Sequence, residues 1–435
     1  MSLNSESLLS DLRWRGLVHQ TTNDEGIEDW LEERSRTVYA GFDPTADSLH
    51  VGSLLGLIVL RRFQKAGHKP IAVVGGATGM IGDPSGKSDE RNLLSKEDLQ
   101  HNVAGLGEQM RRFLDFDAGK YSAELVNNFD WTGPWSYLEF LRDIGKNFPV
   151  NVMLAKDSVR SRLGRDDDAD SGGMSYTEFS YMLLQAYDFV HLNIEFGCEL
   201  QAGGSDQWGN ITAGIDLARR MGRPQLFGVT WPLLTKSDGT KMGKTESGAV
   251  WLSAERTSPY QFYQYWINVD DADAGGCLRM LTELGREEIE SLDVAREGDP
   301  GKRESQRRLA EELTKLVHGD EGLAVAQKAT EIFFGAEINE LNDALLGQIF
   351  ADVPSKELPR ERLGDASLTI IDAFVEAGLA KSKGEARRTI GQGGAYVNNC
   401  RVEGIETVLS SDHLASETVI VLRSGRKKYA LLRFQ

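Results

Sequence analysis

Cysteine is scarce in this 435-residue chain, and long apolar runs are missing. Its three cysteines, Cys198, Cys277 and Cys400, are widely spaced without a CxxC pair, which argues against disulfides and a structural zinc. No apolar run approaches the roughly 20 residues of a membrane helix. The first residues include Glu6 and Asp11 and lack the basic-then-apolar pattern of a signal peptide. We therefore expect a protein of the reducing cytoplasm, without a membrane partner.

Basic residues are also in deficit, since 49 Lys and Arg face 66 Asp and Glu for a net charge of −17. Such an average argues against a nucleic-acid partner, but the charge is uneven. Residues 367–435 carry ten Lys and Arg against seven Asp and Glu, which leaves −20 on residues 1–366. A basic module on an acidic body is expected when only the module contacts a polyanion. A chance fluctuation remains the alternative for so small a surplus.

The first half of the chain alternates strand-like and helix-like segments. The strand-like segments are 38–42, 70–75, 124–128, 199–202 and 226–230. Amphipathic helices at 54–66 and 135–147 lie between them. This alternation predicts an α/β fold with a Rossmann-like, doubly wound parallel sheet. Ligands of such sheets bind at the carboxyl ends of the strands, where Tyr39, Asp43, Asp83 and Asp206 fall.

The rest of the chain follows a different pattern. From residue 257 to about 348 it reads as helical, most clearly at 305–317 and 321–334. Residues 351–366 are charged, contain two prolines and have no sustained apolar face, which predicts a linker. The tail then reads as helices at 368–377 and 383–391, followed by strands at 395–397 and 418–422. Length alone suggests roughly three domains.

Residues 241–245, KMGKT, place two lysines three positions apart in a loop rich in Gly, Ser and Thr. Lysines on a mobile loop can neutralise the charge that builds on a departing pyrophosphate. A solvated surface cluster explains this pentapeptide equally well.

A second candidate lies at residues 38–53, where a short strand runs into the turn at Asp43 and an apolar helix follows. Ser48 is the predicted N-cap of that helix. His50 and Gly52 would then lie at a helix N-terminus, where free N–H groups favour phosphate and glycine admits a nucleotide. A capping or packing role is the alternative for His50.

In this order the segments HVGS (50–53) and KMGKT (241–245) resemble the HIGH and KMSKS motifs of class I aminoacyl-tRNA synthetases. Five further segments, spread over nearly the whole chain, narrow the resemblance to the bacterial tyrosyl-tRNA synthetase family. They are YAGFDPTADSLH (39–50), VGGATGMIGDPSGK (74–87), SYMLLQAYD (180–188), GGSDQWGN (203–210) and TSPYQFYQ (257–264). One position departs from the family pattern, because Ser53 replaces the last His of HIGH.

The resemblance implies a domain order. Residues 1–235 would form the Rossmann-like catalytic domain, and residues 236–350 the KMSKS loop with a helical, tRNA-facing domain. Residues 351–366 would be the linker, and residues 367–435 resemble an S4-like α+β RNA-binding domain through SKGEARRTI (382–390) and GAYVNN (394–399). The tRNA phosphates would meet four cations of the tail. These are Arg387, Arg388, Lys427 and Lys428.

The segment 175–192 carries a polar stripe in an otherwise apolar helix. Tyr181, Gln185 and Asp188 are spaced to share one helical face. Polar groups are costly to bury without partners, although a solvent-facing stripe would need none. The resemblance supplies a partner, a bound tyrosine whose ammonium is held by Tyr181 and Gln185. Asp188 and Tyr39 would bracket its phenol, so that phenylalanine leaves them unpaired.

The glycine-rich segment 75–88 ends in Gly-Lys-Ser, but Ile81 occupies the position where a Walker A motif needs glycine, so the P-loop reading fails. The resemblance makes it a substrate loop, with Asp83 near the amine and Lys87 and Arg91 reaching phosphates. Simple tight turns are the alternative for the first glycines. Gln201 and Gln207 complete the expected tyrosine site.

The resemblance also implies an ATP site. Its expected residues are Gly41, Asp43, His50, Gly52, Ser53, Asp206 and Lys244. Asp206 would bind the ribose, although it could instead cap a helix beginning at Gln207. The groups expected around the departing pyrophosphate are Thr45, His50, Lys241, Lys244 and Thr245, together with Lys87 and Arg91.

The implied function is a two-step, ATP-dependent attachment of L-tyrosine to tRNA(Tyr) through a tyrosyl-adenylate. ATP is a substrate accompanied by Mg²⁺, with no protein-bound metal or organic cofactor expected. The family is dimeric, so a homodimer is expected. Three alternatives remain: tryptophanyl-tRNA synthetase, another nucleotidyltransferase, and a non-catalytic RNA-binding descendant, for which Ser53 is the one hint.

Overall fold

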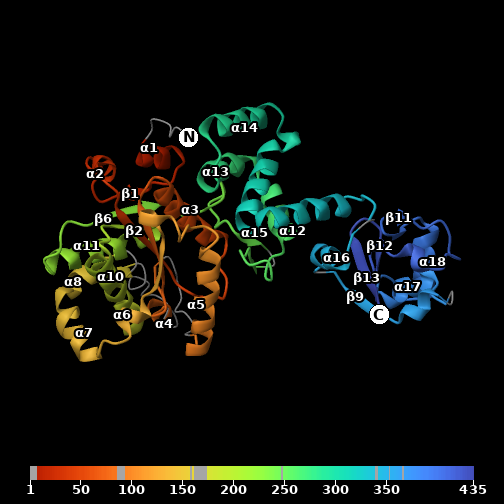
Figure 1. The fold of residues 1–435 in the computed structure, drawn as a ribbon, viewed down its shortest axis with the longest axis horizontal. Helices are drawn as coiled ribbons and strands as arrows, with labels where there is room; N and C mark the ends of the chain where they lie inside the picture. The colour runs from red at the N-terminus through yellow and green to blue at the C-terminus, as the bar shows by residue number, and fades with distance from the viewer. Residues whose placement is uncertain are drawn as a thin grey trace. The chain divides into compact units, whose positions relative to one another are not determined.

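The computed structural model describes residues 7–85, 94–156, 159–160, 174–245, 248–338, 341–351, 353–364 and 367–435 (Figure 1). The chain forms two compact units. The catalytic-side unit comprises Met1–Arg256 and Trp266–Val317, and the C-terminal unit comprises Thr257–Tyr265 and His318–Gln435. None of the described helices is long and apolar enough to cross a membrane.

The catalytic-side unit is built on a six-stranded sheet in the order β1-β6-β5-β2-β3-β4. Its strands are β1 (Gln20–Thr21), β2 (Thr37–Phe42), β3 (Lys69–Val74), β4 (Glu124–Asn127), β5 (Leu200–Gly204) and β6 (Phe227–Trp231). The five longer strands run parallel, which confirms the predicted strands and their direction. The sheet is not wholly parallel, because β1 pairs antiparallel with β6 at the edge. A two-residue strand carries no period for sequence to detect.

Helices surround this sheet (Figure 1). They are α1 (Leu8–Trp14), α2 (Ile27–Glu33), α3 (Val51–Lys65), α4 (Thr78–Ile81), α5 (Lys96–Met110), α6 (Phe129–Thr132), α7 (Tyr137–Asp143), α8 (Val150–Leu154), α10 (Tyr176–Phe196) and α11 (Trp208–Arg220), followed by α13 (Asp271–Leu281) and α14 (Arg286–Gly298). Helix α3 packs against β2 and β3, while α10 and α11 pack on each other.

Local capping fixes where the two helices nearest the candidate site begin. Helix α10 starts with a capping box, in which the Ser175 side chain accepts from the Glu178 N–H and Glu178 bonds back. It ends at Gly197, whose φ of 64° suits glycine. Helix α3 is capped by His50, so the prediction of Ser48 as its N-cap is wrong. The Ser48 hydroxyl instead bonds to the Leu49 carbonyl.

The C-terminal unit combines helices with a five-stranded sheet in the order β11-β10-β12-β13-β9. Its helices are α12 (Pro259–Ile267), the end of α15 (Glu304–Phe333), α16 (Asp343–Ile349), α17 (Ile370–Glu376) and α18 (Lys383–Gly391). Its strands are β9 (Ser355–Leu358), β10 (Ala395–Val397), β11 (Cys400–Arg401), β12 (Val419–Ser424) and β13 (Lys428–Phe434). Helix α15 is interrupted at Gly319, which has φ 75° and ψ −179°, next to the boundary between the two units.

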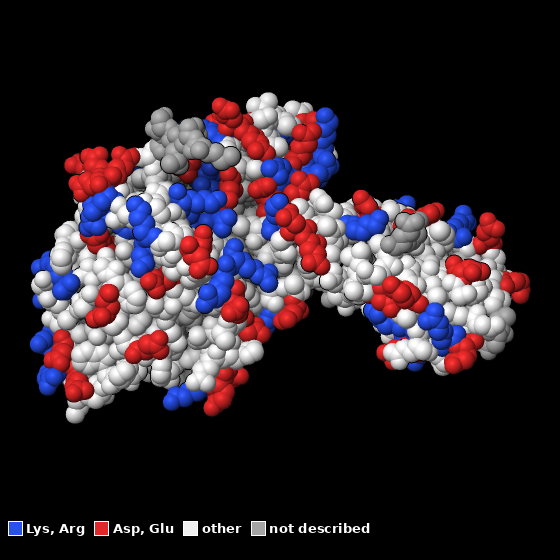
Figure 2. Space-filling model, viewed as in Figure 1, with Lys and Arg blue, Asp and Glu red and all other residues white. Residues whose placement is uncertain are grey.

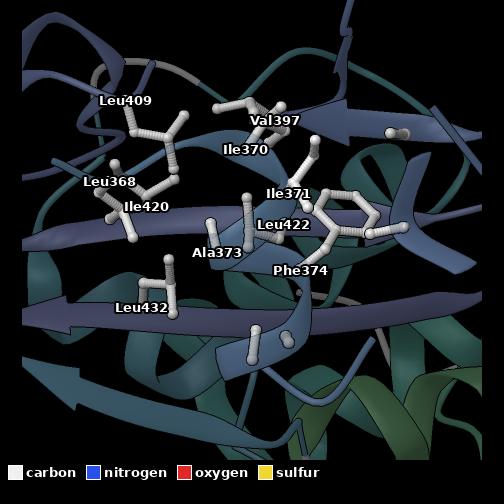
Figure 3. Close-up of a cluster of buried hydrophobic side chains, with 14 of the residues drawn as sticks. Leu368, Ile370, Ile371, Ala373, Phe374, Val397, Leu409, Ile420, Leu422 and Leu432 are labelled. Atoms are coloured by element: carbon white, nitrogen blue, oxygen red, sulfur yellow. The ribbon is translucent and has the colours of Figure 1, made fainter. Parts of the chain in front are cut away.

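This second sheet is apolar on both faces. Ile420 and Leu422 of β12 pack with α17 in the cluster that Figure 3 shows. Val419 and Val421 alternate with them and pack in a separate cluster with α15 and α16. Residues 318–350 therefore share a core with the tail, and do not form a helical domain with residues 236–317 as predicted.

The prediction of a linker at 351–366 is also wrong, because part of this segment belongs to the sheet and core of the C-terminal unit. Residues 355–358 form β9, which pairs in parallel with the end of β13. Leu358 and Leu363 are buried in the core that also contains α17. The segment looked like a linker because three of the four β9 residues are exposed, so the strand has no apolar run.

Candidate active site

A cavity of about 290 Å³ opens at the carboxyl ends of β2 and β5, beside the N-terminus of α3. It brings together thirteen of the residues predicted from the sequence. They are Tyr39, Gly41, Asp43, Thr45, His50, Gly52, Ser53, Asp83, Tyr181, Gln185, Asp188, Asp206 and Gln207. Its wall also includes Thr78, Asn128, Trp231 and Leu233, which sequence reasoning did not single out.

Asp188 is buried on α10 and held by two donors. Asn128 Nδ2 donates to one carboxylate oxygen at 3.0 Å and Trp131 Nε1 donates to the other at 2.8 Å. Burial raises the pKa of Asp188 to about 7, against the two hydrogen bonds that lower it. The result is a carboxyl group close to half-ionised near neutral pH, with both oxygens held in place. Neither Asn128 nor Trp131 belongs to a local pattern that would have revealed this role.

Tyr39 lies at the same end of the cavity. Its ring packs edge-on against Phe189 at 5.3 Å between centroids. Burial, and then the charge of Asp188, raise the pKa of its phenol well above the usual value, so Tyr39 keeps its proton as a hydrogen-bond donor.

Buried polar atoms without a protein partner cluster here. They include the Tyr39 hydroxyl and the side-chain carbonyl oxygens of Gln185 and Gln201. Gln201 does not line the cavity, but it pairs with Tyr39 across β2 and β5. Leaving such atoms unpaired is costly, roughly 1–3 kcal/mol each. A small polar ligand that bonds to them would remove this cost.

Two separate sets of hydrogen bonds hold the side chains of the other cavity walls. The Tyr181 hydroxyl donates to Asp43 at 2.9 Å, and the Thr78 hydroxyl donates to the same carboxylate at 2.7 Å. Across the cavity, Gln207 Nε2 donates to Asp83 at 2.7 Å. These contacts fix the polar stripe of α10 to β2, so the stripe is not solvent-facing. The carboxylates of Asp43 and Asp83 both suit an ammonium group.

The N-terminus of α3 forms the opposite end. His50 Nδ1 accepts the Gly52 N–H at 3.0 Å, which leaves the neutral ring to carry its proton on Nε2. A Cβ on Gly52 would come within 2.8 Å of the His50 ring, so glycine is needed there. His50 therefore both caps α3 and lines the cavity.

Asp206 lies in the turn after β5. Burial and then Asp83 raise its pKa, and backbone N–H groups and Lys241 oppose this. Helix α11 begins at Trp208 with no side-chain cap, which removes the alternative that Asp206 caps it.

The two signature segments, far apart in sequence, lie against each other. The Val51 N–H bonds to the Val250 carbonyl at 3.0 Å, and the Val250 N–H bonds to the Gly243 carbonyl at 2.9 Å. Gly243 has φ 84°, and a Cβ on it would meet Val51 at 2.9 Å. Lys241 and Lys244 are exposed and do not line the cavity. They are nevertheless tied to the α3 N-terminus through this loop.

Some predicted residues are not placed in the site. Lys87 and Arg91 lie outside the described residues, as does the side chain of Thr245. Arg387 and Arg388 are exposed on α18, while Lys427 is exposed in the turn before β13 and Lys428 is exposed at the start of β13. No group of three or more His, Cys, Asp or Glu side chains that could hold a metal is found within the described ranges.

Comparison with protein families gives two matches. The family described as "tRNA synthetases class I (W and Y)" matches residues 31–335, and a "Tyrosine--tRNA ligase SYY-like C-terminal domain" matches residues 346–432. The tyrosine–tRNA ligase of Rhodopirellula baltica is 60% identical over 99% of this chain and 97% of its own length. That of Bacillus caldotenax is 51% identical over 98% of this chain and 99% of its own.

Among solved structures, a C-terminally truncated mitochondrial tyrosyl-tRNA synthetase from Aspergillus nidulans aligns with a TM-score of 0.66 and 30% identity. The alignment covers 75% of this chain and 94% of the truncated one. A tryptophanyl-tRNA synthetase from Encephalitozoon cuniculi aligns at 14% identity with a TM-score of 0.52, which is a likeness of fold alone. The matches to sequence and structure agree, and the chain belongs to the class I tRNA synthetases of the tryptophan and tyrosine family.

Proposed function

We propose that this chain attaches L-tyrosine to tRNA(Tyr) in two ATP-dependent steps, releasing first pyrophosphate and then AMP. The observation that carries the proposal is the unpartnered Tyr39 hydroxyl next to the buried Asp188. A tyrosine phenol between them would donate to Asp188 and accept from Tyr39. Tryptophan offers no such hydroxyl, and the names of the full-length relatives also favour tyrosine.

In the first step the substrate carboxylate attacks the α-phosphate of ATP, and the enzyme acts through positioning and charge. The amine end of tyrosine would lie among Asp83, Tyr181 and Gln185, with Gln201 and Gln207 around it. The Asp206 carboxylate can accept from the ribose hydroxyls. The α3 N-terminus, with Gly52 and Ser53, would face the phosphates together with Gly41 and Asp43.

Charge on the departing pyrophosphate would be neutralised by Lys241 and Lys244, whose loop is joined to the α3 N-terminus. His50 Nε2–H and the Thr45 hydroxyl are further donors. Lys87, Arg91 and Thr245 complete the proposed set on the strength of the family resemblance. Mg²⁺ would arrive with ATP on its phosphates.

In the second step the 3′ end of tRNA(Tyr) takes the tyrosyl group. We assign tRNA binding to the tail, where Arg387, Arg388, Lys427 and Lys428 are exposed. These four cations have no ion pair among the described contacts of the tail, so they can meet phosphate. The face seen in Figure 2 mixes both signs of charge over this unit, which fits contacts at selected points better than a continuous basic surface.

We further propose a cytoplasmic homodimer. All three cysteines are free, as a reducing compartment requires. Exposed apolar side chains gather on the successive helices α6, α7 and α8 and at the start of α10, where they invite a second copy. They are Phe129, Tyr137, Leu138, Val150, Val152, Leu154 and Tyr176. Sedimentation of Leu138→Asp against the parent tests this, and an unchanged mass would contradict it.

ATP–pyrophosphate exchange with each of the twenty amino acids tests the function. Tyrosine alone should support exchange, because only its phenol pairs with both Tyr39 and Asp188. A tryptophan-dependent signal would instead favour the other branch of the family. No exchange with any amino acid, alongside tight tRNA binding, would favour a non-catalytic RNA-binding protein.

A further inference from the structure

The C-terminal sheet carries a row of alternating arginines and tyrosines on the face that α15 covers. Register places Arg401 opposite Tyr396, Tyr396 opposite Arg423, and Arg423 opposite Tyr429 across β11, β10, β12 and β13. Directly opposite residues of antiparallel strands point to the same face. Tyr429 packs in the α15–α16 cluster, so the row lies on that face and away from α17.

The row changes from buried to exposed along its length. Tyr429 is buried and its hydroxyl bonds to Asn399 at 3.2 Å, which fixes that end. The Arg423 guanidinium lies over the Tyr396 ring at 3.8 Å from its centroid. Tyr396 is half-buried and Arg401 is exposed. The outer half of the row is therefore open to a ligand.

Neither arginine of the row is neutralised. Arg401 and Arg423 make no ion pair among the described contacts, and Arg423 Nε is buried without a hydrogen-bond partner. By contrast, Arg362 in the same unit is ion-paired, because its Nη1 donates to both carboxylate oxygens of Glu376. Close to the outer edge, Glu337 interacts with the thiol of Cys400, the first residue of β11.

An exposed aromatic side chain stands beside the row. Phe334, at the end of α15, is 83% exposed. The loop that follows it is tied to the β10–β11 turn, because the Ile338 N–H bonds to the Asn398 carbonyl and Asn399 Nδ2 bonds to the Ala336 carbonyl. Gly335 approaches the Arg423 guanidinium, since a Cβ on it would lie 3.8 Å from Nη1. Phe334 thus directly precedes a glycine that approaches the Arg423 guanidinium.

We propose that Phe334 and the Arg401–Tyr396–Arg423 row bind unpaired nucleotides of the tRNA. Open rings next to uncompensated guanidinium groups are the combination that holds single-stranded nucleic acid, with bases on the rings and phosphates on the arginines. This surface is distinct from Arg387 and Arg388 on α18. The inference rests on the proposed function, because it assumes that tRNA is the partner of the C-terminal unit.

Binding of a tRNA(Tyr) transcript to the full chain, measured over a series of salt concentrations, tests the surface. Phe334→Ala and Tyr396→Leu should each weaken binding by about 5- to 100-fold, the range for losing one base stack, without changing the salt slope. Arg401→Gln should lower the salt slope by about one unit, and Arg401→Lys should restore it. Phe334→Trp should bind as the parent does.

Val294→Ala is the matched control, since Val294 is also a largely exposed apolar residue but lies on α14. Binding by Phe334→Ala and Tyr396→Leu within about twofold of the parent would overturn the inference. If those two variants bound normally while Arg387→Gln with Arg388→Gln weakened binding, the tail would still bind tRNA and only the role given to the Arg401–Tyr396–Arg423 row would be wrong. If no variant weakened binding, the tRNA role of the whole unit would fail. Tyrosine-dependent ATP–pyrophosphate exchange should be unchanged in the variants of Phe334, Tyr396 and Arg401.

Discussion

One site in each unit shows a contrast in how buried polar groups are paired. In the catalytic-side unit, Tyr39, Gln185 and Gln201 bury oxygens without a partner around one cavity. In the C-terminal unit, the buried Asn399 amide bonds to the Ile332 and Ala336 carbonyls and its oxygen accepts from Tyr429. A satisfied polar group adds to the stability of the fold, whereas several unsatisfied groups gathered at one cavity indicate where a ligand can complete their hydrogen bonds. Arg423 Nε of the C-terminal unit is also buried without a partner, and it lies on the surface to which we assign RNA.

The largest effect confined to the catalytic-side unit should come from the two lysines of the KMGKT segment. Lys241→Ala or Lys244→Ala should reduce the rate of tyrosyl-adenylate formation by roughly 10²–10³-fold, because each removes charge that stabilises the departing pyrophosphate. Dissociation constants for tyrosine and ATP should change little. Pre-steady-state kinetics separates the two effects, and the exposed Lys302→Ala is a control on the same unit. A defect confined to binding would contradict the assignment.

Truncation should have the next largest effect. Removing residues after Leu363 should lower tRNA charging on the order of 100-fold while tyrosine-dependent exchange persists. It should also lower the melting temperature, since β12 and β13 cover Ile332 and Phe350. Arg387→Gln with Arg388→Gln in the full chain should weaken charging without that loss of stability. Full charging by the truncated enzyme would show that the tail is not needed.

The pH dependence of tyrosine binding tests the buried carboxyl. Burial raises the pKa of Asp188 to about 7 in the free enzyme. If the phenol donates to the carboxylate, affinity should rise with pH through 7 and level off above it, with about a tenfold gain between pH 6 and 8. Asp188→Asn should flatten this profile. Phenylalanine, which has no hydroxyl, should bind weakly with no such dependence, and a parallel profile for both amino acids would exclude Asp188 as its origin.

The smallest effects concern the first signature. His50→Ala should destabilise folding by about 1 kcal/mol through loss of the cap, and His50→Asn should restore stability but not the rate. Ser53→His should change the rate of activation by no more than about tenfold, because one neutral hydrogen bond is at stake. Thermal unfolding measured alongside exchange separates the two roles. A thousandfold gain from Ser53→His would mark the chain as an impaired synthetase.

Most of the fold could be predicted because each strand of the first sheet beyond β1 is long enough to be seen as a short apolar or β-branched run. The polar stripe on α10 was equally visible, since Tyr181, Gln185 and Asp188 lie on one helix. The second shell of the site was not, because Asn128 and Trp131 reach Asp188 only after β4 is placed next to β3. Such a contact depends on the tertiary fold and leaves no local signal.

The sequence misled most within the C-terminal unit. Residues 351–366 look polar and broken, yet β9 pairs with β13, a strand some 75 residues away that was itself not predicted. The sequence of β13, KYALLRF, begins with Lys428. This residue was predicted as a phosphate contact and not as the start of a strand. Pairing between strands that are distant in the sequence leaves no local signal, so a single sequence does not reveal it.

Gly243 lets two distant parts of the sequence pack closely because glycine has no Cβ. Its positive φ and its closeness to Val51 leave no room for a side chain. A methyl group there would push the lysine loop away from the α3 N-terminus without removing any functional group. The two signatures should therefore respond to mutation as one unit, so that the effects of Gly243→Ala and Val51→Ala on activation do not add. The steric limit on position 243 is thus set by a residue nearly two hundred positions earlier in the chain.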